Sequence, residues 1–280
     1  MTSLQARLNR DQVLQLPRGG ATIEETLTIT AGQFVSGFGR ASALTWAGDP
    51  NTPAVRIEAS ISNTIYDLTV RDLYVRYGWV SIGRLGDSVT LDGITVMDAE
   101  YHGILIDGIG DGQCFRNLRA YSCAGAGVSV ITRSRNNNLL FDHLSVAGNN
   151  GGGVRLWVEG DAASLTSPVI RHGIIQGNGP NPELLVVGSV TNLTLSACRF
   201  ERTTPGYAVL LRPNDQGRTA RGLVVTDGTV IPAKHVTNSI VGTGLTGDIV
   251  IESGCDMGGR PVVATMGTVR RFDVVGAEHA

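Results

Sequence analysis

The sequence lacks any concentration of one charge and any long apolar run. It holds 23 basic and 25 acidic residues, a formal net charge of −2, without a basic stripe or an acidic tail. This balance gives no electrostatic basis for binding nucleic acid or an anionic membrane surface. No stretch of ~18 apolar residues is present that would cross a membrane. We therefore expect neither a nucleic-acid partner nor membrane insertion.

The first residues also lack the apolar segment of a conventional signal peptide, since they run MTSLQARLNRDQV. The protein is therefore expected to work inside the cell or to leave it without that signal. A virion component released by lysis would do the latter, and a chain whose signal had been trimmed would look the same. We expect a virion or extracellular location.

Cysteine is scarce, and its spacing suggests no metal centre. The four cysteines form no CxxC pair and no His-rich metal spacing, and so predict no metal site. Cys198 falls in an apolar column described below, where a small buried hydrophobic side chain is the simpler interpretation. The cysteines do not indicate a redox compartment.

Glycine, in contrast, is abundant, at 37 of 280 residues where ~7% is usual. Charged residues make up only 17% of the chain, and Val, Ile, Leu and Thr recur in short runs. This combination favours many short strands separated by Gly, Asn and Asp turns. No composition break marks a linker, so the length suits a solenoid, which grows by adding coils.

One apolar pattern repeats about every 25 residues. The pattern is an apolar residue, two variable residues, a second residue that is usually apolar, one variable residue and a third apolar residue. The triplets are Ile65, Leu68, Val70; Leu91, Ile94, Val96; Phe115, Leu118, Ala120; Phe141, Leu144, Val146; Ile170, Gly173, Ile175; Leu195, Cys198, Phe200; and Ala220, Leu223, Val225.

The step of three followed by a step of two breaks the alternation of a flat strand. It predicts a sharp corner between two short strands that both point apolar side chains inward. Gly, Asn and Asp suit such a corner because they tolerate left-handed backbone angles, and His is enriched there to a lesser degree. The predicted corner residues are Asp67, Gly93, Asn117, His143, His172, Ala197 and Gly222.

A second apolar column follows each corner in the early coils. Two strand columns and a variable stretch make one coil of a three-sided, all-β, right-handed single-stranded parallel β-helix. Leu4 and Leu8 mark a short N-terminal capping helix. We expect one continuous domain, with a cap and first strands in 1–60, coils in 61–244, and C-terminal strands in 245–280 that form another coil, a cap or an intersubunit strand. The second column comprises Gly103, Ile104, Ile106; Gly127, Val128, Val130; Gly153, Val154, Leu156; and, less regularly, Leu184 with Val186 and Ala208 with Leu210.

The opening segment QARLNRDQVLQLPRGGATIEETLTITAGQFVSGFGRASALTW adds a family likeness. Its short helix, its Leu16-Pro17 and Gly19 segment and its turn at 37–39 resemble the opening of the pectate-lyase-like β-helix superfamily. The likeness is strongest to the branch shared with bacteriophage tailspike and tail-fibre proteins. The resemblance implies the fold and a carbohydrate-related role.

Catalytic motifs of the known branches are not matched. His102 and His172 stand in YHG and RHG without the paired aspartates of polygalacturonases, and Arg212-Pro213 is shorter than the pectate-lyase arginine motif. Nothing resembles the YG-DPH signature of mannuronan epimerases. Fold likeness alone does not assign a chemistry.

The outward positions of the second column are the most informative surface, because they mix apolar and charged side chains. Trp157 could stack on a sugar ring while Arg155, Asp107 and Glu159 bind hydroxyl or acidic groups. The same face could instead pack against a neighbouring subunit of a homotrimer, or lie under an intrachain loop. The outward residues are Leu105, Asp107, Ser129, Ile131, Arg155 and Trp157.

Carboxylates near this column are the catalytic candidates, namely Asp107, Glu159 and Asp161. Two coils lie ~9.6 Å apart, near the upper end of the carboxyl separation in inverting glycosidases. Turn aspartates that bond their own backbone are an alternative explanation. Arg133, a further substrate-binding candidate, could instead form a cross-strand ion pair with Glu159.

The corner histidines and the RSRNNN turn are assigned structural roles. His143 and His172 hold the same corner column, but the 29-residue step between their coils suggests that the two are not in perfect register. The run from Arg133 to Asn138 is most simply a solvated turn, with sugar binding nearby as an alternative.

These features together predict a tailspike-like or tail-fibre-like protein that binds a polysaccharide or cell-surface glycan as a homotrimer, with depolymerase activity left open. A stand-alone polysaccharide lyase, glycoside hydrolase or epimerase is one alternative, and a non-catalytic structural virion protein is another. No cofactor is expected, although carboxylate-rich turns would also suit calcium.

Overall fold

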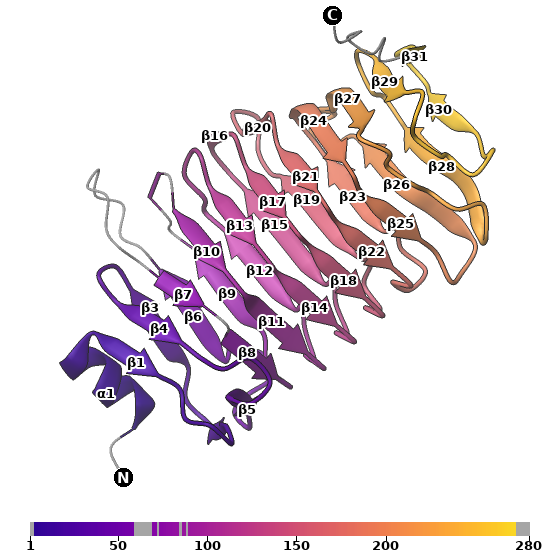
Figure 1. The fold of residues 1–280 in the computed structure, drawn as a ribbon. Coiled ribbons are helices and arrows are strands. Elements are labelled where there is room, and N and C mark those ends of the chain that lie inside the picture. The colour runs from indigo at the N-terminus through magenta and orange to yellow at the C-terminus, as the bar shows by residue number, and fades with distance from the viewer. Residues whose placement is uncertain (1–2, 59–68, 72, 84–85, 88, 273–280) are drawn as a thin grey trace, which may run out of the picture.

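The computed structural model describes residues 3–58, 69–71, 73–83, 86–87 and 89–272. The chain coils into a rod of stacked strands, with its two ends at opposite ends of the rod (Figure 1). The central coils each contribute strands to three long sheets, and neighbouring coils pair in parallel. The protein is therefore a right-handed parallel β-helix, as the repeat predicted. Among the described residues, no helix is long and apolar enough to span a membrane.

We number the long sheets in the order in which each coil crosses them. The first sheet contains β10 (Thr90–Asp92), β13 (Cys114–Arg116), β16 (Arg135–Asn137), β17 (Leu140–Asp142), β20 (Ser164–Thr166), β21 (Val169–Arg171), β24 (Val190–Ser196), β27 (Arg221–Thr226), β29 (Ile249–Glu252) and β31 (Val269–Phe272). The second contains β2 (Ala21–Ile23), β5 (Ala43–Trp46), β8 (Leu73–Arg76), β11 (Ile94–Met97), β14 (Arg119–Tyr121), β18 (Ser145–Ala147), β22 (Ile174–Gln176) and β25 (Arg199–Glu201).

The third sheet contains β3 (Leu27–Thr30), β6 (Val55–Glu58), β9 (Val80–Gly83), β12 (Ile104–Asp107), β15 (Val128–Thr132), β19 (Val154–Val158), β23 (Leu184–Val187), β26 (Gly206–Arg212), β28 (Val236–Gly242) and β30 (Val262–Ala264). A smaller N-terminal sheet contains β1 (Val13–Gln15), β4 (Phe34–Ser36) and β7 (Thr69–Arg71).

The predicted capping helix is present as α1 (Leu4–Asp11) at one end of the rod (Figure 1). Ser3 caps it by accepting a hydrogen bond from the backbone N–H of Ala6. Leu8 is fully buried, and Gln5 exchanges two hydrogen bonds with the backbone of Thr28 in β3. The helix therefore covers the first coil and satisfies backbone groups that an open end would expose.

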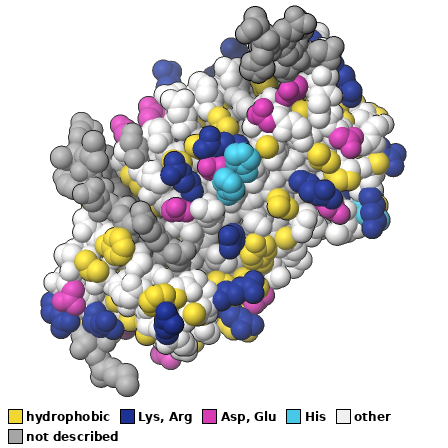
Figure 2. All heavy atoms as spheres, in the orientation of Figure 1, with side chains coloured by type: hydrophobic (Ala, Val, Ile, Leu, Met, Phe, Trp, Pro, Cys, Tyr) yellow, Lys and Arg dark blue, Asp and Glu magenta, His cyan; other side chains and the backbone are white. Residues whose placement is uncertain are grey.

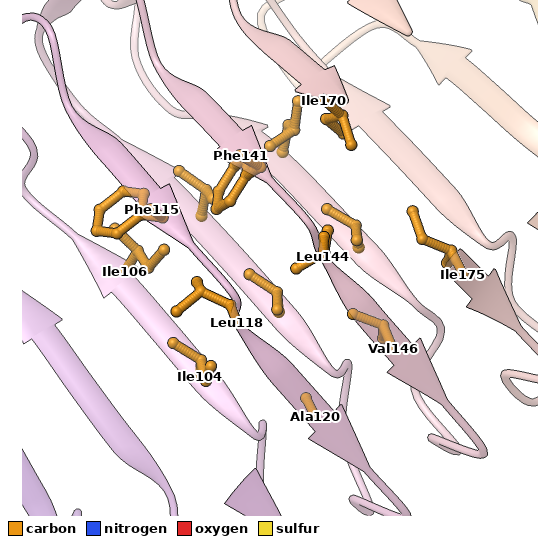
Figure 3. Close-up of a cluster of buried hydrophobic side chains, with 14 of the residues drawn as sticks. Ile104, Ile106, Phe115, Leu118, Ala120, Phe141, Leu144, Val146, Ile170 and Ile175 are labelled. Atoms are coloured by element: carbon orange, nitrogen blue, oxygen red, sulfur yellow. The ribbon is translucent and has the colours of Figure 1, made fainter. Parts of the chain in front are cut away.

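The core is a set of apolar ladders that run along the rod (Figure 3). Leu118, Leu144 and Val146 are buried, as the triplets require, and the rings of Phe115 and Phe141 stack at 5.5 Å between centroids. Cys198 is also buried in this core as a free thiol, which agrees with its predicted role as a small hydrophobic side chain.

The corner between the first and second sheets is a single left-handed residue in five consecutive coils. The φ angles are 76° at Gly93, 53° at Asn117, 56° at His143, 53° at His172 and 50° at Ala197. Their backbone N–H groups each donate to a carbonyl of the next coil, as from Asn117 to Asp142 at 2.9 Å. The predicted corners are confirmed at these positions.

Ala197 offers a direct test of this corner. A β-carbon in the left-handed region costs ~1–2 kcal/mol, whereas the added freedom of glycine in the unfolded chain costs less. Ala197→Gly is therefore expected to raise the free energy of unfolding by about 0.5–1 kcal/mol in urea titrations. Ala147→Gly, on strand β18, is expected to lower it by a similar amount. A loss of stability in Ala197→Gly equal to that in the control would contradict the assignment.

The structure corrects the two terminal triplets. Ile65 and Leu68, like the predicted corner Asp67, lie outside the described residues, and Val70 belongs to β7. Ile94 and Val96 pair with Leu73 and Val75 and not with the predicted Leu68 and Val70. The apolar pattern of this coil therefore lies five residues later in the sequence than predicted.

At the other end, Leu195 pairs with Val225 where Ala220 was predicted, and the corner falls at Asp227. Gly222, which also has a positive φ of 73°, lies inside β27. The corner of that coil holds one extra residue, because Cys198 aligns with Thr229. In the second column, Leu184 and Val186 are confirmed, but their partners are Val209 and Leu211, one residue beyond the predicted pair Ala208 and Leu210.

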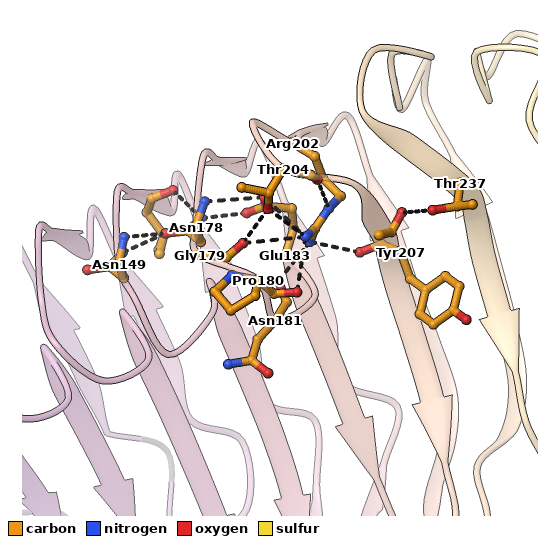
Figure 4. A network of polar contacts seen from close by, with 12 residues as sticks. Asn149, Asn178, Gly179, Pro180, Asn181, Glu183, Arg202, Thr204, Tyr207 and Thr237 are labelled. Carbon is orange, nitrogen blue, oxygen red and sulfur yellow. Dashed lines mark hydrogen bonds and ion pairs between the residues drawn. The ribbon is translucent and has the colours of Figure 1, made fainter.

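A buried polar column joins consecutive coils where the second sheet gives way to the third (Figure 4). The Asn149 side chain accepts from the backbone of Cys123 at 2.9 Å and donates to the Asn178 side chain at 2.7 Å. Asn178 in turn donates its backbone N–H to the Glu183 carboxylate. Each amide therefore satisfies groups of the neighbouring coil in a place that water does not reach.

Arg202 ends this column, and it is fully buried. Its closest carboxylate oxygen is on Glu183, 4.0 Å away. Its guanidinium donates to backbone carbonyls of the loop before β23 and of residues 204–207, where β26 begins (Figure 4). The acceptors are the carbonyl oxygens of Gly179, Pro180, Asn181, Thr204 and Tyr207.

Candidate functional site

The outward face of the third sheet carries the surface singled out in the sequence. Leu105, Ser129 and Arg155 pair in register across β12, β15 and β19. The second outward row, two residues further along each strand, is formed by Asp107, Ile131 and Trp157. Inward positions between these rows are buried. The predicted alignment of the second column is therefore confirmed over these three coils.

Two guanidinium groups lie near the indole ring of Trp157. The Cζ atom of Arg155 is 3.8 Å from the centroid of the indole ring, and that of Arg212 is 5.8 Å from it. Arg212 reaches this position because Val187 pairs with Trp157 on one side and with Arg212 on the other. Both cations are therefore attracted to the electron-rich face of the indole.

Neither of these two guanidiniums has a carboxylate within ion-pair distance among the described residues. The Nε of Arg155 is also buried without a hydrogen-bond partner there. Burial lowers the pKa of Arg155, and the charge of Arg212 lowers it further. Arginine nevertheless stays charged at neutral pH, so this surface holds uncompensated positive charge beside an aromatic ring.

Three further rings extend the surface from the loops that lead into the third sheet. The rings of Trp79 and Tyr101 are 5.2 Å apart, and those of Tyr101 and His102 are 4.5 Å apart. Tyr101 is 47% exposed, so its ring is available to a ligand. His102 Nδ1 accepts a hydrogen bond from the backbone of Ala126, while burial, assisted by the charge of Arg155, lowers the pKa of His102 to about 4. His102 is therefore neutral at pH 7.

The carboxylates predicted as catalytic lie at the far edge of this face. Arg133 bonds to Asp107 and to Glu159, the latter with 2.8 Å between Nε and Oε2. The predicted Arg133–Glu159 ion pair is therefore present, and Asp107 joins it. Asp161 stands apart and is 3.9 Å from Arg218. The structure thus brings together Asp107, Arg133 and Glu159, and separately Arg155 and Trp157.

Trp79, Tyr101, His102 and Arg212 were not predicted as parts of this surface. A signal for two of them was present, since Tyr101 and His102 directly precede Gly103, where the second column begins. Trp79 directly precedes Val80 of β9, and since Val80 pairs with Ile104, Trp79 aligns with Gly103 itself. Arg212 could be placed only with the correct register of β26.

A second polar cluster occupies the corner between the first and second sheets. Asp142 Oδ1 lies 2.9 Å from His143 Nδ1 and 3.0 Å from His172 Nδ1, and Asp142 Oδ2 lies 2.9 Å from an Arg171 nitrogen. These contacts, with the hydrogen bond from Arg171 first, hold the pKa of Asp142 well below its usual range. Figure 2 shows histidine side chains beside basic and acidic ones at mid-length on this face.

The two histidines were predicted to be out of perfect register, and this was wrong. β17 and β21 are direct neighbours, and the His143 N–H donates to the carbonyl of Arg171. The additional residues of the longer coil lie in 159–168, after β19, and therefore do not shift the corner.

A cleft of about 400 Å³ lies on the same side of the rod. Asn117 is the corner residue of the coil that precedes His143 in the sequence. Its side chain donates a hydrogen bond to the Asp92 carboxylate at 2.7 Å, at the edge of this cleft. The lining consists of polar and aromatic side chains with one exposed arginine from the second sheet, Arg119. The lining residues are Gly39, Arg40, Tyr74, Asp92, Gly93, Thr95, Asn117, Arg119 and Tyr121.

The fold places the chain in the class of parallel β-helix proteins. No protein-family profile matches it, and no curated protein matches it by sequence. Among solved structures, the A-module of Azotobacter vinelandii mannuronan C-5 epimerase AlgE6 has a TM-score of 0.59 and 14% identity, over 98% of this chain and 94% of that one.

A viral protein also has a similar fold. Geobacillus virus E2 ORF18 has a TM-score of 0.57 and 15% identity, over 93% of this chain and 52% of that one. The present chain thus spans about half the length of that viral protein. The Dettilon tailspike protein has a TM-score of 0.42 and 14% identity, over 95% of this chain and 63% of that one. At such identities the likeness establishes the fold alone.

Proposed function

We propose that this protein binds an acidic polysaccharide on the outward face of the third sheet, as a glycan-binding β-helix of the phage tailspike or tail-fibre kind. The observation that carries the proposal is the pairing of aromatic rings with guanidiniums that lack a carboxylate partner among the described residues. Rings of Trp157 and Tyr101 offer flat apolar surfaces to a sugar. Arg155 and Arg212 offer donors to its carboxylate or hydroxyl groups.

The same charges favour a glycan over a neighbouring subunit as the occupant of this face. A subunit that covered Arg155 and Arg212 would remove their hydration, which is costly unless it supplied carboxylates in return. An acidic glycan brings its own carboxylates and leaves much of the face in contact with water. We therefore propose that the subunits of a homotrimer contact one another elsewhere on the rod. We also propose that the protein acts in a virion or outside the cell.

Binding is favoured over catalysis by the state of the predicted catalytic carboxylates. Asp107 and Glu159 share the Arg133 guanidinium and are partly exposed. An oxygen of each carboxylate already contacts Arg133, so the two groups are engaged with a shared partner rather than directed at a ligand. Depolymerase activity is therefore the second candidate, and new reducing ends or unsaturated products after incubation with a bound polymer would support it.

Substitution of the aromatic anchor tests the proposal. Trp157→Ala is expected to weaken binding to polyuronates such as polymannuronate or polygalacturonate about 30-fold, the effect of removing ~2 kcal/mol at a central aromatic contact. Arg155→Ala should weaken binding about tenfold and reduce its dependence on salt. Neutral dextran should bind weakly to all forms. Affinity is measured by isothermal titration calorimetry, and mass in solution by light scattering.

Arg119→Ala is the matched control, because it removes the same charge from the cleft on the second sheet. Unchanged binding in Trp157→Ala and Arg155→Ala would refute the proposal, and loss in Arg119→Ala alone would move the site to the cleft. If either variant of the third sheet instead dissociated an oligomer, this face would be a subunit interface.

A further inference from the structure

The cluster at the corner of the first and second sheets has the composition of a metal site. Three ligand atoms converge there, His143 Nδ1, His172 Nδ1 and Asp142 Oδ1, and all lie within 4.8 Å of one another. The two nitrogens lie 2.9 and 3.0 Å from the carboxylate oxygen. Such separations are a few tenths of an ångström shorter than the ~3.3 Å edge of a tetrahedron with ligands ~2.0–2.1 Å from a central ion, so only a small movement of the side chains is needed to admit the ion.

The fold holds the two imidazoles in place. Both histidines occupy the left-handed corner of adjacent coils, with φ angles of 56° and 53°. The hydrogen bond from the His143 N–H to the carbonyl of Arg171 fixes the two corners one strand spacing apart. The rings consequently lie side by side, with 4.6 Å between centroids. The backbone of the solenoid thus orders the two imidazoles before any ion arrives.

Asp142 is oriented by a separate contact. Its side chain is only 10% exposed, and Arg171 bonds to Oδ2, which leaves Oδ1 directed at the two imidazoles. The histidine side chains are 60% and 48% exposed. One side of the cluster is therefore fixed in the protein, and the other is open to solvent.

We propose that Asp142, His143 and His172 form an open, three-ligand site for a divalent transition metal of the zinc class. Each imidazole would bind through Nδ1 and carry its proton on Nε2. Three protein ligands leave at least one coordination position free for water or an anionic group. That position faces the solvent beside the cleft that begins at Asn117.

The ligand set distinguishes this ion from calcium or magnesium. Those ions prefer six or more oxygen ligands, whereas two of the three donors here are imidazole nitrogens, which suit zinc, copper and nickel. The charge of Arg171 also balances that of Asp142, so the cluster offers little net negative charge to a hard cation. The proposal is independent of the glycan-binding face, which lies on another sheet.

Calorimetric titration of the tag-free, chelator-treated full chain with ZnCl₂ at pH 7 tests the site. The wild type should bind one Zn²⁺, and CaCl₂ should give no comparable signal. His143→Asn and His172→Asn should each weaken binding at least about tenfold. Asparagine is chosen because it accepts the left-handed backbone of the corner. His235→Asn, at an exposed histidine with a φ of 60°, is the matched control and should bind as the wild type does.

Circular dichroism establishes that each variant is folded, and electron paramagnetic resonance of the Cu²⁺-loaded wild type gives a result that needs no variant. Two coordinated nitrogens in that spectrum support the site, and their absence overturns it. The proposal also fails if the wild type binds no Zn²⁺ at millimolar concentration, or if both corner variants bind as tightly as His235→Asn.

Discussion

Replacing Arg202 by alanine is expected to lower the free energy of unfolding by about 3–5 kcal/mol, because it removes a buried charged group and leaves several buried acceptors unsatisfied. The guanidinium donates to five backbone carbonyls and is the nearest cation to the buried Glu183 carboxyl. Its loss leaves these acceptors without donors in a place closed to water. Urea titration followed by circular dichroism measures the effect.

Arg199→Ala is the matched control, because Arg199 is a half-exposed arginine on β25, the strand that directly precedes Arg202, and has a single carboxylate partner, Glu201. Exposed pairs of this kind contribute ~0–1 kcal/mol. Arg202→Met retains most of the volume and should be nearly as unstable as Arg202→Ala, since both lack the donors. Equal, small losses in Arg202→Ala and Arg199→Ala would show that the network contributes little.

The second large effect concerns the dependence of stability on pH. Burial raises the pKa of Glu183 from 4.5 to about 7, against the opposing hydrogen bonds from Asn178. The folded protein therefore binds this proton more tightly than the unfolded chain does. The resulting stabilisation is complete below pH 4.5 and is lost as the pH rises through 7.

The measurement compares the wild type with Glu183→Gln, so that every other titrating group cancels. The advantage of the wild type over the variant should fall by about 3 kcal/mol between pH 4 and pH 8. If the nearby charge of Arg202 dominated, Glu183 would be ionised in the folded protein and the difference would change in the opposite direction.

The repeat at the centre of the rod could be predicted because the same constraints act on every coil. Leu118 and Leu144 lie in neighbouring coils and face one axis, and a corner of fixed geometry separates them from Phe115 and Phe141. A parallel ladder propagates that register from coil to coil, so one well-placed triplet determines its neighbours.

The register failed where loops and corners changed length. At Asp227 the corner takes up one additional residue before Thr229, and the apolar spacing alone does not distinguish this from a shifted strand. Val70 belongs to two series with the same apolar spacing, one that ends at Val70 and one that continues to Leu73 and Val75. Only the pairing with Ile94 and Val96 of the next coil shows that the second series is correct. Periodicity defines the strands but not the number of residues between them.

The candidate site was predictable only in part, for a similar reason. Arg155 and Trp157 belong to a strand whose alternation reveals which side chains face outward. Tyr101 and His102 lie in a loop, where no period fixes the direction of a side chain. Arg212 approaches Trp157 from two coils away, a contact that arises from stacking and has no counterpart in the local sequence.

The unequal connections between the third and first sheets have a broader consequence. Residues 108–113 join β12 to β13, whereas 159–168 lie between β19 and β21 and include β20, yet the corner that follows keeps its geometry. The length of these connections can therefore change without altering the spacing between neighbouring coils. Selection can lengthen or remodel one edge of the molecule, as it does with surface loops on other rigid scaffolds, without displacing the side chains presented on the adjoining flat surfaces.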